Sequence, residues 1–124
     1  SIFLGYIFGA FIIYSTMKSE ISLYTWLVVF GYYLADTTST SVIRLLTVKN
    51  WYHTHRSHAY QNLARILNNH SKVTAGIIFY HLLWLLPLAV LTVIKPSFSI
   101  LAVFLAFLPS TIWSIKFGPF YSKD

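Results

Sequence analysis

The chain has 124 residues, of which 56% are hydrophobic, 19% aromatic and only 10% charged, and its formal net charge is +6. A soluble domain carries about 25% charged residues, so this composition argues against one and places the chain among membrane proteins. The absence of cysteine excludes disulfides and thiolate chemistry. In so apolar a chain the positive charge indicates cytoplasmic loops and anionic lipid rather than nucleic acid.

Four apolar runs predict four membrane-spanning helices, at about residues 2–16, 21–46, 73–94 and 98–115. The expected fold is all-α and polytopic, with one further amphipathic helix on the cytoplasmic side. In the first run, Gly5 and Gly9 stand four residues apart. That spacing either lets another helix approach closely or has no special role in a membrane helix. A tight polar turn at 17–20 separates the first run from the second.

Asp36 is the only carboxylate inside an apolar run. An ionisable group in such a place is costly and usually faces a cavity or a partner, so Asp36 is a candidate contributor to catalysis. The structural alternative is that Asp36 lies near the interface and pairs with Arg44. The hydroxyl cluster that follows, Thr37 to Ser41, can bond back to helix carbonyls and needs no further role.

The polar loop at 47–72 contains the stretch Trp-Tyr-His-Thr-His-Arg-Ser-His-Ala-Tyr-Gln at 51–61. Three histidines and an arginine in eleven residues make it the expected place of the chemistry. Beyond it, an apolar face is expected at Ala59, Leu63, Ile66 and Leu67, with polar residues elsewhere at Gln61, Asn62, Arg65 and Asn68. This pattern predicts a short amphipathic helix at the membrane surface, ended by residues 68–71.

The third run contains His81 and Pro87. A lone histidine in a span is more often a hydrogen-bonding group within the bundle than a catalyst. Pro87 is expected to kink the helix, because its ring displaces the carbonyl four residues earlier. A turn at 95–97 leads into the fourth run.

The distribution of lysine and arginine predicts the orientation. Four spans would place the loop and the carboxyl tail on one side, with seven basic residues: Arg44, Lys49, Arg56, Arg65, Lys72, Lys116 and Lys123. The other side has only Lys18 and Lys95. The positive-inside rule therefore places the loop in the cytoplasm.

The loop residues favour phosphate over metal. His53, His55 and His58 are spaced as zinc ligands could be, but no cysteine or carboxylate in the loop completes such a site. Arg56 offers a planar bidentate fork and His58 a hydrogen-bond donor, with Tyr60 and Gln61 beside them, a set that suits a diphosphate or a nucleotide. The composition equally fits a basic linker that contacts lipid.

The same residues carry a family resemblance. The pattern Trp51-Tyr52-x-x-His55-Arg56-Ser57-His58-Ala59-Tyr60-Gln61, followed by Leu63-Ala64-Arg65 and by Leu83-Trp84-Leu85-Leu86-Pro87-Leu88, resembles the polyprenyl-phosphate N-acetylhexosamine-1-phosphate transferases (glycosyltransferase family 4). The branch that initiates O-antigen, a relative of phospho-N-acetylmuramoyl-pentapeptide transferase, is the most similar in pattern. Other branches have two more histidines where this chain has Tyr60 and Gln61, which puts a histidine-specific role there in doubt.

The resemblance implies transfer of a sugar-1-phosphate from a UDP-N-acetyl sugar to undecaprenyl phosphate in the bacterial inner membrane, with Mg²⁺ and release of UMP. His55, Arg56, His58, Tyr60 and Gln61 would help bind the nucleotide sugar. The opening Ser1-Ile2-Phe3-Leu4-Gly5 is similar to the residues that come directly after the family's Gly-Asp-x-Gly motif. The motif itself, the paired aspartates and most Mg²⁺ ligands would lie upstream, so the chain alone is expected to be inactive.

The acidic residues support this expectation, because Glu20, Asp36 and Asp124 are the only three and cannot assemble a complete magnesium site. The alternative function is a small standalone membrane protein whose basic loop binds anionic lipid or a partner. Which UDP-sugar is used, and whether the protein forms a homodimer, are left open by the sequence.

Overall fold

The computed structural model describes residues 2–47 and 58–118. Within these ranges 89% of the residues are helical and there is no strand, which confirms the all-α prediction. The helices are α1 (Ile2–Met17), α2 (Leu23–Val29), α3 (Gly31–Thr47), α4 (Ala59–Ile66), α5 (His70–Tyr80), the π-turn η1 (His81–Leu85), α6 (Leu86–Ile94), the 3₁₀ turn η2 (Pro96–Phe98) and α7 (Ser99–Phe117).

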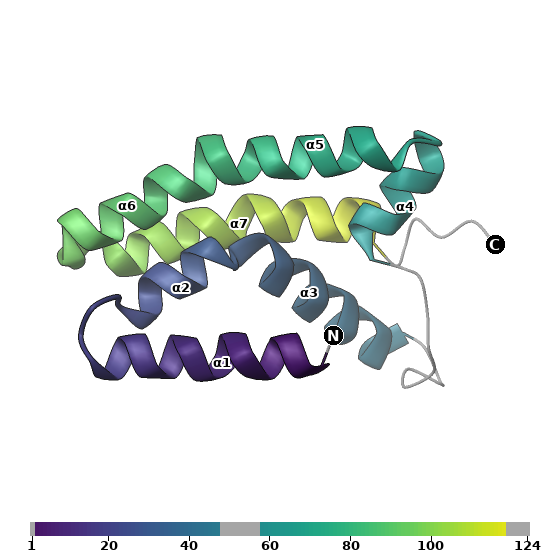
Figure 1. Ribbon diagram of the computed structural model, residues 1–124. Coiled ribbons are helices and arrows are strands. Elements are labelled where there is room, and N and C mark those ends of the chain that lie inside the picture. Colours follow the sequence, from purple (N-terminus) through teal and green to yellow (C-terminus); the bar gives the residue numbers. More distant parts are fainter. Residues whose placement is uncertain (1, 48–57, 119–124) are drawn as a thin grey trace.

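The helices form an elongated bundle (Figure 1). The continuous rod α5–η1–α6 runs beside α7, and α2 packs against both α6 and α7. The helix α3 packs against α7, whereas α1 lies at the outside of the bundle and contacts α2. The short α4 closes the end at which α3 and α7 finish, so this end collects the residues on either side of the polar loop.

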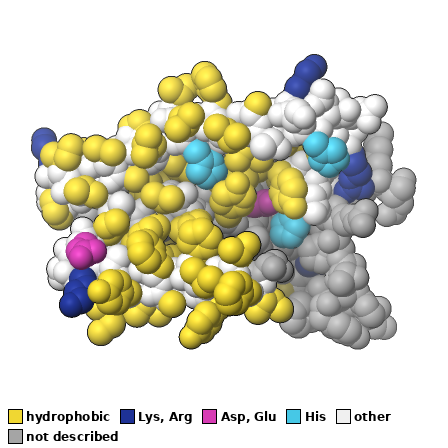
Figure 2. Space-filling model, in the orientation of Figure 1, with side chains coloured by type: hydrophobic (Ala, Val, Ile, Leu, Met, Phe, Trp, Pro, Cys, Tyr) yellow, Lys and Arg dark blue, Asp and Glu magenta, His cyan; other side chains and the backbone are white. Residues whose placement is uncertain are grey.

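In the part of the chain that the structure describes, two helices are long and apolar enough to cross a membrane, namely His70–Ile94 with 25 residues and Pro96–Phe117 with 22. The apolar helix α1 is shorter. On the face shown in Figure 2, hydrophobic side chains cover the length of the bundle, and lysines and arginines gather at its two ends. This distribution is the one a membrane-embedded bundle would have.

The predicted second span is not one helix. The chain leaves helical geometry at Phe30 (φ −88°, ψ 4°) and divides into α2 and α3. Gly31 follows at the place where α3 meets α7, and a Cβ there would lie 3.4 Å from the Cβ of Ala106. The bend therefore brings the backbone of α3 close to α7, and the prediction of a continuous helix over 21–46 is wrong.

The predicted third span is continuous but distorted. The π-turn over His81–Leu85 ends two residues before Pro87. Because proline has no N–H to donate and its ring crowds the preceding turn, the wider π-turn accommodates it without a break. His81 Nδ1 lies 2.8 Å from the carbonyl oxygen of Ile77 in the same rod, so this histidine makes a hydrogen bond inside the helix.

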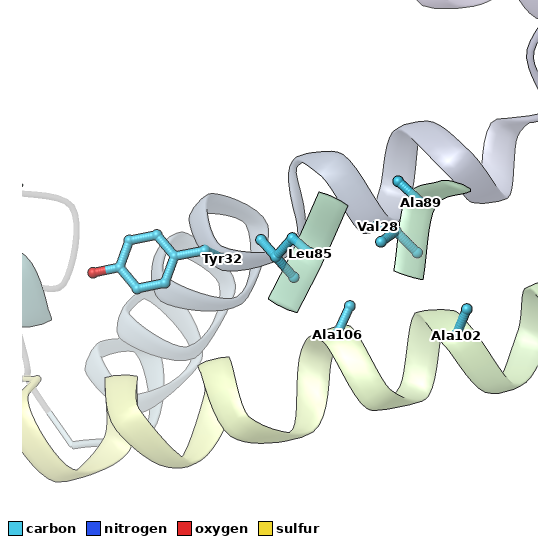
Figure 3. Close-up of a cluster of buried hydrophobic side chains, with 6 residues drawn as sticks. All are labelled: Val28, Tyr32, Leu85, Ala89, Ala102 and Ala106. Carbon is cyan, nitrogen blue, oxygen red and sulfur yellow. The ribbon is translucent and has the colours of Figure 1, made fainter. Parts of the chain in front are cut away.

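Small side chains let α7 approach its neighbours closely. Its buried positions, spaced three or four residues apart, are Ser99, Ala102, Ala106, Ser110 and Ser114. Figure 3 shows Ala102 and Ala106 in a cluster with Val28, Leu85 and Ala89, and with Tyr32, whose ring points away from the other members. Small residues at a helix interface are the usual means of close packing in membranes.

Candidate functional site

The candidate site lies where α3, α4 and α7 meet, and Asp36 is at its centre. Asp36 is only 3% exposed, although it carries a carboxylate. One carboxylate oxygen accepts a hydrogen bond from the backbone N–H of Ala59 at 3.1 Å. The other lies 3.5 Å from His58 Nδ1, an ion-pair distance when the imidazole is protonated. Asp36 thus holds the first turn of α4, where unpaired helix N–H groups favour a negative charge.

The candidate residues of α4 are arranged around this contact. His58 is the N-cap residue of α4, and its ring stacks on that of Tyr60 with centroids 6.2 Å apart. Gln61 Nε2 donates to the Tyr60 hydroxyl at 3.1 Å. The side-chain oxygen of Gln61 is buried and has no hydrogen-bond partner among the described residues. The structure therefore brings four of the sequence candidates together: Asp36, His58, Tyr60 and Gln61.

The remaining candidates, His55 and Arg56, lie outside the described residues, as do His53, Trp51 and Tyr52. Asp36 is not paired with Arg44, which follows two turns later, about 12 Å along the same helix. The partners of Asp36 are instead His58 and the α4 backbone. Of the hydroxyls after Asp36, that of Thr37 bonds back as expected, donating to the carbonyl of Tyr33 at 2.7 Å. The buried hydroxyl of Thr40 does not, since it has no hydrogen-bond partner among the described residues.

Asn62 is a structural residue that the sequence interpretation misplaced. It is 3% exposed, and its Nδ2 donates to the carbonyls of Phe117 (2.8 Å) and Gly118 (2.9 Å) at the end of α7. Arg65 donates in turn to the side-chain oxygen of Asn62. Since the last carbonyls of a helix have no partner within it, Asn62 caps α7 from another helix.

The predicted apolar face of α4 is correspondingly wrong in part. Ala59 is buried as expected, but Ile66 and Leu67 are about half exposed, at 47% and 50%. Asn62 stands three residues after Ala59 and therefore lies on the inner face of α4, not on the polar side. That spacing was the signal in the sequence. It was outweighed by the assumption that an asparagine points to water.

The described residues do not form a magnesium site. No group of three or more histidine, aspartate or glutamate side chains in the described ranges could hold a metal ion. Both oxygens of Asp36 already face α4, and Glu20 lies in the turn after α1, at the other end of the bundle. No step of a reaction can be assigned to Mg²⁺ from these residues.

Comparison with known proteins gives this chain no relative. No protein-family model matches it, and neither a curated protein nor a solved structure is significantly similar. The arguments for function therefore rest on the residues and on their geometry.

Proposed function

We propose that the chain is a carboxy-terminal part of a sugar-1-phosphate transferase of the bacterial inner membrane. It would act on a UDP-N-acetyl sugar and undecaprenyl phosphate, with four spans and the polar loop in the cytoplasm. Within this proposal His55, Arg56 and His58 bind the diphosphate, and Tyr60 and Gln61 complete the hydrogen-bonding set. Mg²⁺ would be held mostly by residues upstream of Ser1.

The observation that carries the proposal is the contact between Asp36 and the start of α4. A buried carboxylate is costly unless it is hydrogen-bonded, so the contact fixes the carboxyl end of the loop against the bundle. His58 is thereby held at a defined place beside Tyr60. A site that must orient a diphosphate needs such preorganised donors. In this proposal Asp36 is a positioning residue and His58 and Arg56 touch the substrate.

The test is transfer of radiolabelled sugar phosphate to undecaprenyl phosphate by membranes that contain the product of the whole reading frame around this chain. Arg56→Ala and His58→Ala should each lower the rate by a hundredfold or more, because each removes a phosphate contact in a partly dry site. Membrane insertion should be unchanged. Lys95→Ala, which removes a cation at the other end of the bundle, is the matched control and should retain the rate.

Two results would contradict the proposal. Wild-type membranes that release no UMP from any UDP-N-acetyl sugar would exclude the transferase. Variants that transfer normally but bind anionic vesicles less tightly, in a salt-dependent way, would favour the second function, a basic loop that binds lipid.

A further inference from the structure

An apolar cavity of about 290 Å³ lies between α5 and α7, beneath α4. Its walls come from four helices and are almost entirely apolar. They include Leu63 of α4, Leu67 directly after α4, Val73 and Gly76 of α5, and Trp113 of α7. Among the described residues of the lining, Lys72 in the first turn of α5 is the one that carries a charge.

Beside the cavity lies a second, more open hollow on the surface of α5 and η1. The second hollow is lined by Ala75, Gly76, Phe79, Tyr80, Leu83 and Trp84, so the two share Gly76 and Tyr80. From Lys72 to Trp84 the groove made up of these two hollows follows the helix for about 18 Å. One leaflet of a bilayer has about 15 Å of hydrocarbon, so the groove has the length of a single acyl chain.

The charge at one end of the groove selects the headgroup. Lys72 lies at the end of the bundle that also carries Arg65 in the last turn of α4 and Lys116 in the last turn of α7. The only carboxylate of the described residues at this end is Asp36, which is buried and bonded to α4. A lipid chain in the groove would thus place its headgroup phosphate in a basic environment.

Gly76 keeps the groove open at its middle. A Cβ built on Gly76 would meet no atom within 4 Å, so the space beside it is empty. Leu67 and Trp113 at the walls remain 50% and 41% exposed, which leaves the groove accessible from the lipid side.

From these features we infer that the groove along α5 binds one acyl chain of an anionic diacyl phospholipid, with the phosphate at Lys72. The inference requires the bundle to lie in a membrane but does not depend on transferase activity. A phospholipid fits better than undecaprenyl phosphate, because the prenyl chain is much longer than the groove.

The experiment is native mass spectrometry of the purified, delipidated protein with added phosphatidylglycerol or phosphatidylcholine. Gly76→Leu should fill the groove and lower the apparent affinity for phosphatidylglycerol about tenfold or more. Lys72→Ala should lower it about fivefold, the factor that corresponds to about 1 kcal/mol. Phosphatidylcholine should bind more weakly to the wild type and should be insensitive to Lys72→Ala.

The chain offers close controls for both changes. Gly5 also has no atom within 4 Å of a built Cβ, but it lies on α1, away from the groove, so Gly5→Leu should bind phosphatidylglycerol within twofold of the wild type. Lys95→Ala removes a cation from the other end of the bundle and should behave likewise. Helical circular dichroism verifies that each variant is folded.

Equal binding by the Gly76→Leu and Gly5→Leu variants would overturn the inference. So would retention of undecaprenyl phosphate in place of phosphatidylglycerol, which would assign the groove to a prenyl lipid. Because no nucleotide sugar is present in this measurement, its failure leaves the proposed transferase untouched, and a failed transferase assay leaves this binding site standing.

Discussion

The two ends of the bundle are held together by different means. One end of the bundle holds the turns after α1 and α6. There the polar contacts that cap α2 join residues close together in the sequence, such as the Ser22 hydroxyl, which accepts a hydrogen bond from the N–H of Thr25. At the end with α4, Asp36 bonds across 23 residues to Ala59, and Asn62 across 55 residues to Phe117. The first end combines such local caps with one long-range hydrogen bond, between the hydroxyls of Thr25 and Thr92, whereas the second end exists only once three helices have assembled.

The largest effect is expected from Asp36→Ala at the α4 end. The substitution leaves the buried N–H of Ala59 unpaired and removes the charge beside His58, so we expect a loss of about 2–4 kcal/mol in the free energy of unfolding. Denaturant titration measures this loss. Hydrogen exchange at the Ala59 amide should accelerate before the amides of α7 do.

Asp36→Asn is the matched variant, because its side-chain oxygen can still accept from Ala59. If the two variants are equally destabilised, the charge matters more than the hydrogen bond. If Asp36→Ala is as stable as the wild type, the contacts of Asp36 with Ala59 and His58 are not what holds α4 in place.

A smaller effect is expected from Asn62→Ala, which removes the hydrogen bonds that Asn62 donates to the carbonyls of Phe117 and Gly118. The expected loss is about 1–3 kcal/mol, because these carbonyls lie at the end of α7 and are partly buried. A thermal melt of the purified protein measures it. Asn62→Asp, which cannot donate, should be no better than alanine, and a melting temperature equal to that of the wild type would contradict the role as a cap.

The smallest effect is expected from Thr92→Val at the turn end. Thr25 and Thr92 share a buried hydrogen bond of 2.7 Å between α2 and α6, yet Thr25 also contacts Ser22 within its own turn. Interhelical hydrogen bonds of this kind average about 0.6 kcal/mol, so the unfolding free energy should fall by less than about 1 kcal/mol. A loss as large as that of Asp36→Ala would show that both ends depend equally on long-range contacts.

The sequence predicted what depends on local pattern. The apolar runs predicted the helical class, Pro87 predicted the distortion of the third run, and the apolar spacing after Ala59 predicted α4. It did not predict the bend at Phe30, which accompanies the close approach of Gly31 to Ala106, a residue 75 positions later. The partners of Asp36 and Asn62 were missed because each is a contact between helices. The local pattern could have shown that Asn62 faces inward, but not which residues it contacts.

The π-turn affects which side of the long rod α5–η1–α6 faces the neighbouring helices. Buried or half-buried positions recur every four residues in it: Val73, Ile77, His81, Leu85 and Ala89. An α-helix turns about 100° per residue, so four-residue steps overshoot a full turn by about 40°, and the face would drift by about 160° over this stretch. The extra residue of the π-turn takes up part of that angular drift. The rod of 25 residues can thus keep one side against its neighbours over more of its length.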